Sequence, residues 1–337
     1  MSVHIEQIDL NLKRRFDPFV CTLEDFRSSD APMRQCLELA WIAAQTDLPV
    51  LILGESGTGK TLLARAVHNS SRRAKGPFVS FNAAALSETL LDSQLFGHER
   101  GAFTGAQKRL KGKFELSHQG TLFIDEIADM SAPGQSKILR AVEYGEFERL
   151  GSEKLQVADV RLISATHLPK EHFTHSGSFR RDLFYRLNGM TLTLPPLRQR
   201  TYDLPFLIAA EIDLAAAKKG KRITGLSRAA AQTLLCYDWP GNLRELNRVL
   251  RAAVAIGEGP ILERSAILLE ESQPPVRVGL EDQKPPQFPG AGSDWTLKSL
   301  ERKHIRWVLN QMGGNKRRTA RALGISRSTL DRKLTTS

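Results

Sequence analysis

Short apolar runs alternate along the first part of the chain with segments whose apolar residues recur every three or four positions. The apolar runs predict buried strands, and they are Val50–Leu53, Pro77–Asn82, Gly120–Glu126, Val160–Thr166 and Thr191–Leu194. The segments with the longer period predict helices, and they are Ala31–Ala44, Leu62–Val67, Ser136–Tyr144 and Phe179–Leu187. Together they favour an α/β fold with a parallel sheet flanked by helices. In the first helix, we expect a shared apolar face of Met33, Cys36, Leu37, Ala40 and Trp41.

The pattern changes near the second half of the chain. From Asp203 to Ile256 the period is helical throughout, which predicts a small all-α lid, and Phe147–Lys154 before it reads as a turn or hairpin. Residues 272–294 contain five prolines and three glycines without an apolar period, so we interpret them as a linker. The predicted parts are a short N-terminal segment without a regulatory domain (1–24), an α/β subdomain (25–200), the lid (201–271), the linker (272–294) and a C-terminal domain (295–337).

The C-terminal domain has a helix–turn–helix pattern. A helix over Leu297–Met312 is followed by two short helices, Lys316–Leu323 and Ser326–Leu334, that a turn at Gly324 separates. Ala320, Leu323, Ile325 and Leu330 are expected to close its core. The candidate DNA-contacting residues are Lys316, Arg317, Arg318, Arg327, Ser328, Thr329 and Arg332.

The charge of the chain is concentrated in that domain. The whole chain of 337 residues carries a net charge of +11. Residues 295–337 hold eleven Lys and Arg against two acids, so +9 of this charge lies there. Double-stranded DNA is therefore the expected partner of this domain, and the alternative, a solvated basic tail, does not explain its apolar pattern.

Composition excludes several other classes. Cys21, Cys36 and Cys236 have neither metal-binding nor redox spacing, which suits a reduced cytoplasm. No apolar run reaches the roughly 18 residues of a membrane span, and Met1–Leu10 lacks the pattern of a secretion signal. We therefore expect a cytoplasmic protein without a membrane partner.

The strongest chemical motif is a glycine-rich turn between the first predicted strand and the next helix. It consists of Gly54, Glu55, Ser56, Gly57, Thr58, Gly59, Lys60 and Thr61. Such a loop directs backbone N–H groups at phosphate oxygens, next to the positive end of a helix dipole. Lys60 is expected to reach the β- and γ-phosphates and the Thr61 hydroxyl to bind Mg²⁺, so the sequence predicts a site for ATP.

Two carboxylates end the predicted strand at residues 120–126. Asp125 and Glu126 follow the phosphate-binding loop by some sixty residues, and parallel strands end at the same edge of a sheet. One carboxylate can hold hydrated Mg²⁺ while the other polarises the attacking water. The pair therefore predicts hydrolysis of the nucleotide.

A third motif places an aromatic residue and a hydroxyl between glycines. Its residues are Gly101, Ala102, Phe103, Thr104, Gly105 and Ala106. An exposed phenylalanine is unfavourable unless it contacts something, which suggests a mobile contact loop. The alternative is a loop folded back onto the core.

These motifs together resemble the bacterial enhancer-binding proteins, which are AAA+ transcription activators of sigma-54 RNA polymerase. The likeness runs from about Phe26 to the C-terminus, and residues 101–106 match a loop peculiar to that family. The resemblance implies a AAA+ P-loop ATPase fold with a helical lid, followed by a Fis-type helix–turn–helix domain. It is closest to short activators that lack a regulatory domain, which suggests control by a separate protein or by abundance.

The resemblance also implies roles for individual residues. Asp125 would support Mg²⁺, Glu126 would activate water, Asn82 would hold Glu126 inactive, and Thr166 would sense the γ-phosphate. Arg180 and Arg186 match arginines that reach a neighbouring subunit's site, and the alternative for arginines on such a helix is plain surface charge. Arg244 matches a lid arginine that contacts nucleotide, and Phe103 and Thr104 match residues that contact sigma-54. The chain departs from the usual pattern at His167 (usually asparagine), Ala83 (cysteine), Gln94 and Gln199 (both glutamate).

The resulting hypothesis is an ATP-driven activator that works as a ring, a hexamer by resemblance. It would bind upstream DNA, hydrolyse ATP, and convert a closed sigma-54 RNA polymerase complex to an open one. One alternative is a DNA-binding regulator that uses ATP only to set its oligomeric state, and another is a DNA-processing AAA+ motor. Both lack a reason to carry the loop at residues 101–106.

Overall fold

The computed structural model describes residues 3–4, 20–84, 88–175 and 179–269, together with residues 309, 315, 316, 330, 331 and 334. The chain divides into two compact units, Met1–Glu270 and Glu271–Ser337, and each is considered by itself. Among the described residues, no helix is both long and apolar enough to cross a membrane.

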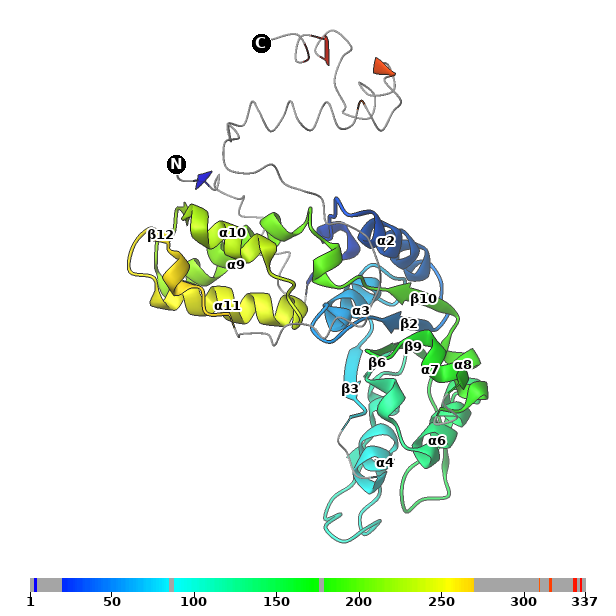
Figure 1. The fold of residues 1–337 in the computed structure, drawn as a ribbon. Helices are drawn as coiled ribbons and strands as arrows, with labels where there is room; N and C mark the ends of the chain where they lie inside the picture. Colours follow the sequence, from blue (N-terminus) through cyan, green and yellow to red (C-terminus); the bar gives the residue numbers. More distant parts are fainter. Residues whose placement is uncertain are drawn as a thin grey trace. The chain divides into compact units, whose positions relative to one another are not determined.

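A five-stranded parallel sheet forms the centre of the first unit (Figure 1). Its order is β10 (Met190–Thr193), β2 (Val50–Leu53), β9 (Val160–Thr166), β6 (Gly120–Asp125) and β3 (Phe78–Asn82). The interior strands are continuous apolar runs because both of their faces are covered. Since all five strands run the same way, their carboxyl ends meet at one edge of the sheet.

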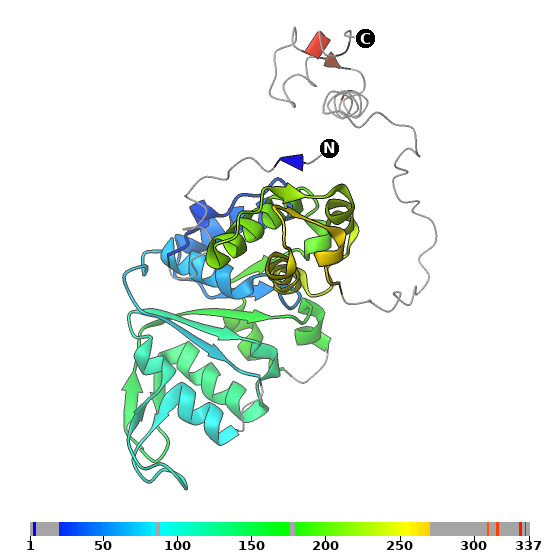
Figure 2. The same cartoon turned by 90° about the vertical axis from the view of Figure 1, so that its left-hand side faces the viewer.

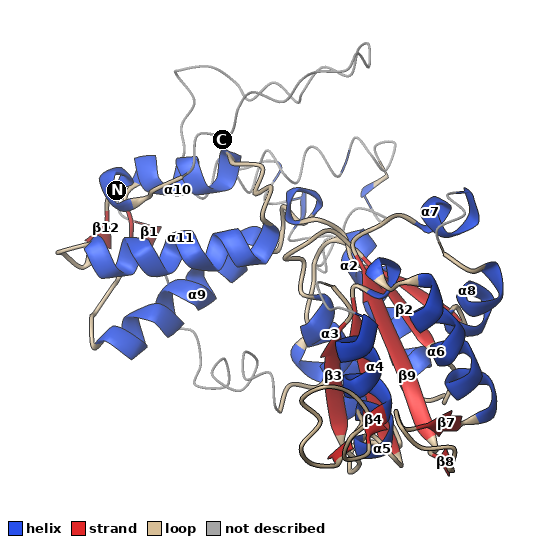
Figure 3. Cartoon of the chain, turned by 90° about the horizontal axis from the view of Figure 1, so that it is seen from below, coloured by secondary structure: helices blue, strands red, loops and turns tan. Residues whose placement is uncertain are grey.

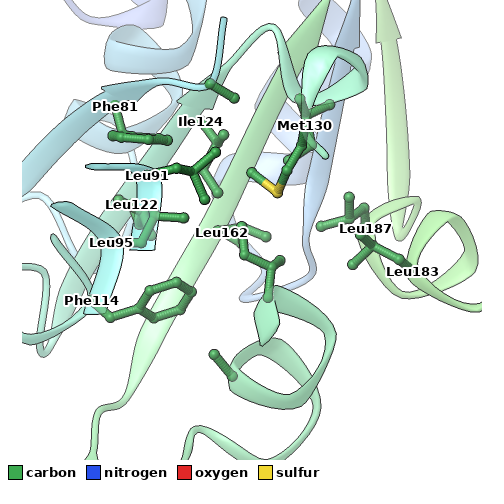
Figure 4. Packing of buried hydrophobic residues seen from close by; sticks show 14 of the residues in the cluster. Phe81, Leu91, Leu95, Phe114, Leu122, Ile124, Met130, Leu162, Leu183 and Leu187 are labelled. Atoms are coloured by element: carbon green, nitrogen blue, oxygen red, sulfur yellow. The ribbon is translucent and has the colours of Figure 1, made fainter. Parts of the chain in front are cut away.

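Helices cover both faces of this sheet (Figure 1). On one face lie α2 (Ala31–Ala44) and α3 (Lys60–Asn69), which share a buried cluster with β2 and β9. The other face is covered by α4 (Glu88–Phe96), α5 (Lys113–Leu116), α6 (Ala132–Tyr144), α7 (Lys170–His175) and α8 (Arg181–Leu187). Figure 4 shows the core of this second face, where Leu91 and Met130 pack against Leu122, Ile124 and Leu162 of the sheet.

The lid follows the last strand of the sheet. It consists of α9 (Leu204–Lys219), α10 (Arg228–Cys236) and α11 (Asn242–Ile256), which lie together beside the α/β part in Figure 3. Trp239 is fully buried and helps to close their common core. A small sheet of β1 (Val3–His4), β11 (Gly225–Leu226) and β12 (Ile261–Leu262) completes the lid.

Two antiparallel hairpins extend from the α/β part. One pairs β4 (Gly97–His98) with β5 (Leu110–Lys111), and the other pairs β7 (Glu146–Glu148) with β8 (Leu155–Val157). Four short 3₁₀ segments complete the described structure, η1 (Leu23–Asp25), η2 (Ile127–Asp129), η3 (Leu197–Gln199) and η4 (Arg264–Ala266). Figures 1 and 2 both place the hairpin that carries residues 101–106 at the end of the first unit remote from the lid helices.

Most of the elements expected from the sequence are confirmed, and α2, β2 and β9 have the predicted bounds. The predicted face of α2 was wrong at Trp41, which is 38% exposed, because Ala43 and Ala44 take the buried positions instead. The hairpin predicted near Phe147–Lys154 is β7–β8. The linker and most of the helix–turn–helix pattern lie outside the described residues, although Leu330, a predicted core residue, is fully buried.

Candidate functional site

The glycine-rich loop connects β2 directly to α3, as the sequence predicts. Gly57 and Gly59 have φ values of +81° and +102°, which side-chain-bearing residues rarely adopt. A Cβ atom on Gly57 would also lie 2.4 Å from the carbonyl oxygen of Gly241. Lys60 begins α3, and its Nζ donates to the carbonyl oxygen of Gly54 at 2.9 Å. The loop is therefore curled with its lysine folded back across it.

Asp125 ends β6, and Glu126 follows it with a φ of +52°. The Glu126 Oε1 atom lies 3.6 Å from Lys60 Nζ, so the loop and the acidic pair meet as expected. Burial and the neighbouring Glu126 charge raise the pKa of Asp125, although Lys60 opposes this. Burial also raises the pKa of Glu126, but hydrogen bonds from His167 and the charge of Lys60 outweigh it, so the net pKa of Glu126 is lowered.

These groups line one cavity of about 320 Å³. Lys60, Arg65 and Arg244 supply positive charge, and Arg244 NH1 donates to Ser56 Oγ at 3.0 Å. Thr61 and Asp125 line the same cavity, and their oxygen atoms are ligands that suit Mg²⁺. No group of three or more His, Cys, Asp or Glu among the described residues could hold a metal. The donor set therefore fits a Mg²⁺ ion that takes its remaining ligands from phosphate and water.

A second, more apolar cavity of about 150 Å³ adjoins the loop. Thr58 and Gly59 form one wall, and apolar side chains from the N-terminal segment, α3, the end of β10 and the lid form the rest, among them Phe26, Leu62, Leu194, Leu207 and Leu243. A cavity of this kind suits a flat heterocyclic base. The sequence motifs do not reveal it, because its residues come from four distant segments and share no spacing.

The lid is bound to the glycine-rich loop by Asn242, which starts α11 and is fully buried. Its Oδ1 accepts a hydrogen bond from the Leu197 amide at 2.8 Å, and its Nδ2 donates to the Ser56 carbonyl at 3.0 Å. Glu55 joins this contact, because it accepts from Asn242 Nδ2 at 3.2 Å and from Arg198 NH1 at 2.8 Å. Sequence reasoning gave Glu55 only a place in the loop and gave Asn242 and Arg198 no role.

Asn82 and Thr166 lie at the same edge of the sheet as Asp125. Asn82 pairs with Asp125 across the strands, but its Oδ1 accepts from the Ala84 amide at 2.8 Å. Thr166 is fully buried, and its Oγ1 accepts from the Leu168 amide at 3.1 Å. The residue bonded to Glu126 is instead His167, through its backbone N at 3.1 Å and its Nδ1 at 2.8 Å.

Arg180 and Arg186 lie away from the cavity. Arg180 precedes α8, where it donates to Asp182 Oδ2 at 2.7 Å and to Ser136 Oγ at 2.8 Å. Arg186 is exposed and donates to the carbonyl of Glu143 at 3.1 Å. Neither side chain lines the cavity of its own chain.

The loop at residues 101–106 lies between β4 and β5. It closes on itself through a hydrogen bond of 2.9 Å from the Gly101 amide to the Ala106 carbonyl. Phe103 is half-buried with its ring edge-on to His98, 5.0 Å between centroids, while Thr104 is exposed. Each of the two alternatives therefore holds for part of the loop. The Thr104 side chain is exposed, as a contact loop requires, whereas the Phe103 ring packs back against the hairpin.

Of the candidate DNA-contacting residues, the structure describes Lys316 alone. Its Nζ lies 2.8 Å from Asp331 Oδ1, so this lysine is already part of an ion pair. Arg317, Arg318, Arg327, Ser328, Thr329 and Arg332 lie outside the described residues.

Three families match successive parts of the chain. The Sigma-54 interaction domain matches residues 26–193, the AAA+ ATPase lid domain matches residues 198–274, and the Fis family of bacterial regulatory proteins matches residues 296–335. The three matches follow one another in the order expected from the sequence.

Relatives with similar sequences are regulatory proteins. The chain is 43% identical over 307 residues to the regulatory protein AtoC of Escherichia coli, covering 91% of this chain and 66% of that protein. It is 40% identical over 316 residues to a Nif-specific regulatory protein of Klebsiella pneumoniae, covering 92% of this chain and 59% of that protein. The chain thus spans about two thirds or less of the length of these relatives.

Among solved structures, NtrX from Brucella abortus in complex with ATP is similar over 92% of this chain and 68% of that one. The TM-score is 0.66 and the sequence identity 32%. A second NtrX structure, in complex with ADP, is 33% identical with the same TM-score.

Proposed function

The chain belongs to the family of sigma-54-dependent transcription activators, with their AAA+ ATPase domain, lid and Fis-type domain, and from this we propose that it drives open-complex formation by sigma-54 RNA polymerase. The observation that carries the proposal is the loop at residues 101–106. All six residues of the motif are present, and they lie on a hairpin that extends away from the lid (Figure 2). A protein that used ATP only to set its oligomeric state would have no need of such a loop.

ATP is the proposed substrate. Its base would occupy the apolar cavity beside Thr58 and Gly59, and its phosphates would lie in the adjoining cavity along the glycine-rich loop. Lys60 and Arg244 would neutralise the phosphate charge from opposite sides, one from α3 and one from the lid. Mg²⁺ held by Thr61 and Asp125 would supply further charge neutralisation at the phosphates.

Glu126 is the proposed base that accepts a proton from the attacking water. Its carboxylate is ionised at neutral pH, as a base requires, and the contacts with His167 and Lys60 that lower its pKa make it a weaker base while they persist. Arg180 and Arg186 lie outside their own chain's cavity, which supports a ring in which each site takes arginines from the neighbouring subunit. Six subunits would be the family's arrangement.

Residues 295–337 are the proposed domain for double-stranded upstream DNA, joined to the ATPase by the linker at 272–294. Tethering the ring near a promoter raises its local concentration at the polymerase. A separate regulatory protein is the proposed source of control, in the reducing environment that three cysteines outside any disulfide suit.

Thr104→Ala tests the proposal, because Thr104 is exposed and does not line the nucleotide cavity. The variant should retain ATP hydrolysis and operator binding, while open-complex formation with sigma-54 RNA polymerase falls to the level measured without the protein. Thr233→Ala is a control, since Thr233 is a partly exposed threonine on the lid. Activation by Thr104→Ala equal to that of the wild type would favour the regulator that does not engage sigma-54.

A further inference from the structure

We propose that His167 is a positioning residue that holds the Glu126 carboxylate in a resting conformation and so limits ATP hydrolysis. The inference rests on the proposed function, because it concerns the base of that reaction. At position 167 this sequence has histidine where the family usually has asparagine. The proposal assigns to His167 the role of holding Glu126 inactive, which the resemblance led us to expect of Asn82.

His167 and Lys60 both contact the Glu126 carboxylate. Glu126 Oε2 accepts two hydrogen bonds from His167, one from its backbone amide at 3.1 Å and one from Nδ1 at 2.8 Å. Glu126 Oε1 lies 3.6 Å from the Lys60 ammonium. The Glu126 side chain is 18% exposed, and His167 and Lys60 are the groups that lower its pKa against the effect of burial.

This environment is unsuited to proton abstraction. A general base must offer a lone pair to the water that it activates, at hydrogen-bond distance. Here Oε2 is occupied by two donors and Oε1 faces the cation that the phosphates require. Glu126 must therefore leave at least one of these partners before it can act, and the His167 hydrogen bond opposes that movement.

The position of His167 in the sheet explains why it reaches Glu126. Strand β6 has β3 on one side and β9 on the other, so its end is flanked by Asn82 and by the residue that follows Thr166. The hydrogen bonds to the Glu126 carboxylate come from His167, on the β9 side. The β9 side is therefore the side that holds the carboxylate.

The chemistry of the imidazole defines the informative variants. A carboxylate oxygen accepts, so Nδ1 of His167 carries the proton in this contact. His167→Ala removes that donor but leaves the backbone amide. In His167→Asn the side-chain amide branches from Cγ as the imidazole Nδ1 does, so a donor returns to the same oxygen. The His167 side chain is 45% exposed, so neither change leaves a buried cavity.

The test measures basal ATP turnover of the full-length chain. A hydrogen bond to a charged group corresponds to roughly a tenfold change in an equilibrium, so His167→Ala should raise kcat several-fold, up to about tenfold, with KM unchanged. His167→Asn should return kcat toward the wild-type value. His118→Ala, an exposed histidine outside the cavity, should not alter turnover. A kcat for His167→Ala equal to or below the wild-type value would overturn the proposal.

A second measurement needs neither ATP nor turnover. The midpoint of denaturant unfolding should be compared for His167→Ala, Glu126→Ala and the double variant, because contacting residues show non-additive effects. Strict additivity would contradict the contact. The two proposals can fail separately: a wild-type chain without ATP hydrolysis would refute the proposed function, whereas normal hydrolysis with an unaltered His167→Ala would refute only the role of His167.

Discussion

The buried histidine His68 makes the stability of the folded chain depend on pH. His68 lies on α3 with 2% of its surface exposed, and its Nδ1 is 2.8 Å from Thr121 Oγ1. Burial, opposed by a hydrogen bond with the Gly76 backbone, lowers the pKa of His68 from 6.5 to about 4. The unfolded chain takes up this proton near pH 6.5 and the folded chain only near pH 4, so stability falls as the pH drops through that window.

The expected loss in the free energy of unfolding from this group is about 2 kcal/mol between pH 7 and pH 5. His68→Asn keeps a polar partner for Thr121 but cannot titrate, so its stability should fall by about 2 kcal/mol less over the same interval. Denaturant unfolding at the two pH values measures the difference. If both proteins lose the same stability between pH 7 and pH 5, the shifted histidine is not the cause.

Residues fixed by a local motif could be predicted from the sequence, whereas contacts between motifs could not. Lys60 and Thr61 follow a glycine pattern that is typical of phosphate-binding loops, and Asp125 and Glu126 come at the end of a continuous apolar strand. The bond from His167 to Glu126 depends on which neighbouring strand a side chain turns toward, and no spacing encodes that choice. Sequence reasoning therefore found the groups of the site but not the partner of its base.

At the scale of elements, the N-terminus of α11 decides how the lid meets the glycine-rich loop. Asn242 has a φ of +52° and is fully buried, and asparagine tolerates this conformation better than most residues. Its side chain bonds Leu197 of η3 and both Ser56 and Glu55 of the glycine-rich loop, so it joins two segments to the start of α11. The Asn242 amide thus joins the lid to the loop, together with the hydrogen bonds from the Leu243 amide to the Gly57 carbonyl and from Arg244 to Ser56.

Asn242→Ala should lower the free energy of unfolding by roughly 2–3 kcal/mol, because buried partners lose their hydrogen bonds and the backbone is strained. ATP affinity should fall as well, since Arg244 sits in the next residues of the same helix turn. Denaturant unfolding and a nucleotide titration measure the two effects. Asn247→Ala, in the same helix and partly exposed, should change stability by less than about 0.5 kcal/mol.

The elements themselves were largely predictable, because strands buried on both faces are continuous apolar runs. Val50–Leu53 and Val160–Thr166 were predicted with the observed bounds. The face of α2 was less predictable, since whether Trp41 or Ala44 is buried depends on the sheet beneath the helix. The apolar cavity beside Thr58 was beyond sequence reasoning because the lid and the N-terminal segment form it together.

At the scale of the whole molecule, the proposed ring requires that each site draw residues from two chains. Lys60 and Glu126 lie in one chain's cavity, while Arg186 is exposed on α8 outside it. Lys60→Ala and Arg186→Ala should therefore each abolish most hydrolysis when assayed alone. An arginine supplied by a neighbour can contribute about 10³–10⁵ in rate, so the loss of Arg186 should be large.

Mixing the two inactive variants distinguishes a shared site from a site within one chain. At some interfaces of the mixed ring, an Arg186→Ala subunit provides Lys60 and the adjacent Lys60→Ala subunit provides Arg186. Such an interface contains every required group, so the mixture should regain measurable ATP turnover. A mixture of Lys60→Ala and Glu126→Gln is the matched control and should stay inactive, because both residues must come from the same chain. If both mixtures regained ATP turnover, the recovery could not be attributed to an arginine supplied by the neighbouring subunit. If neither mixture regained ATP turnover, Arg186 would act within its own subunit, and the argument for a ring would be lost.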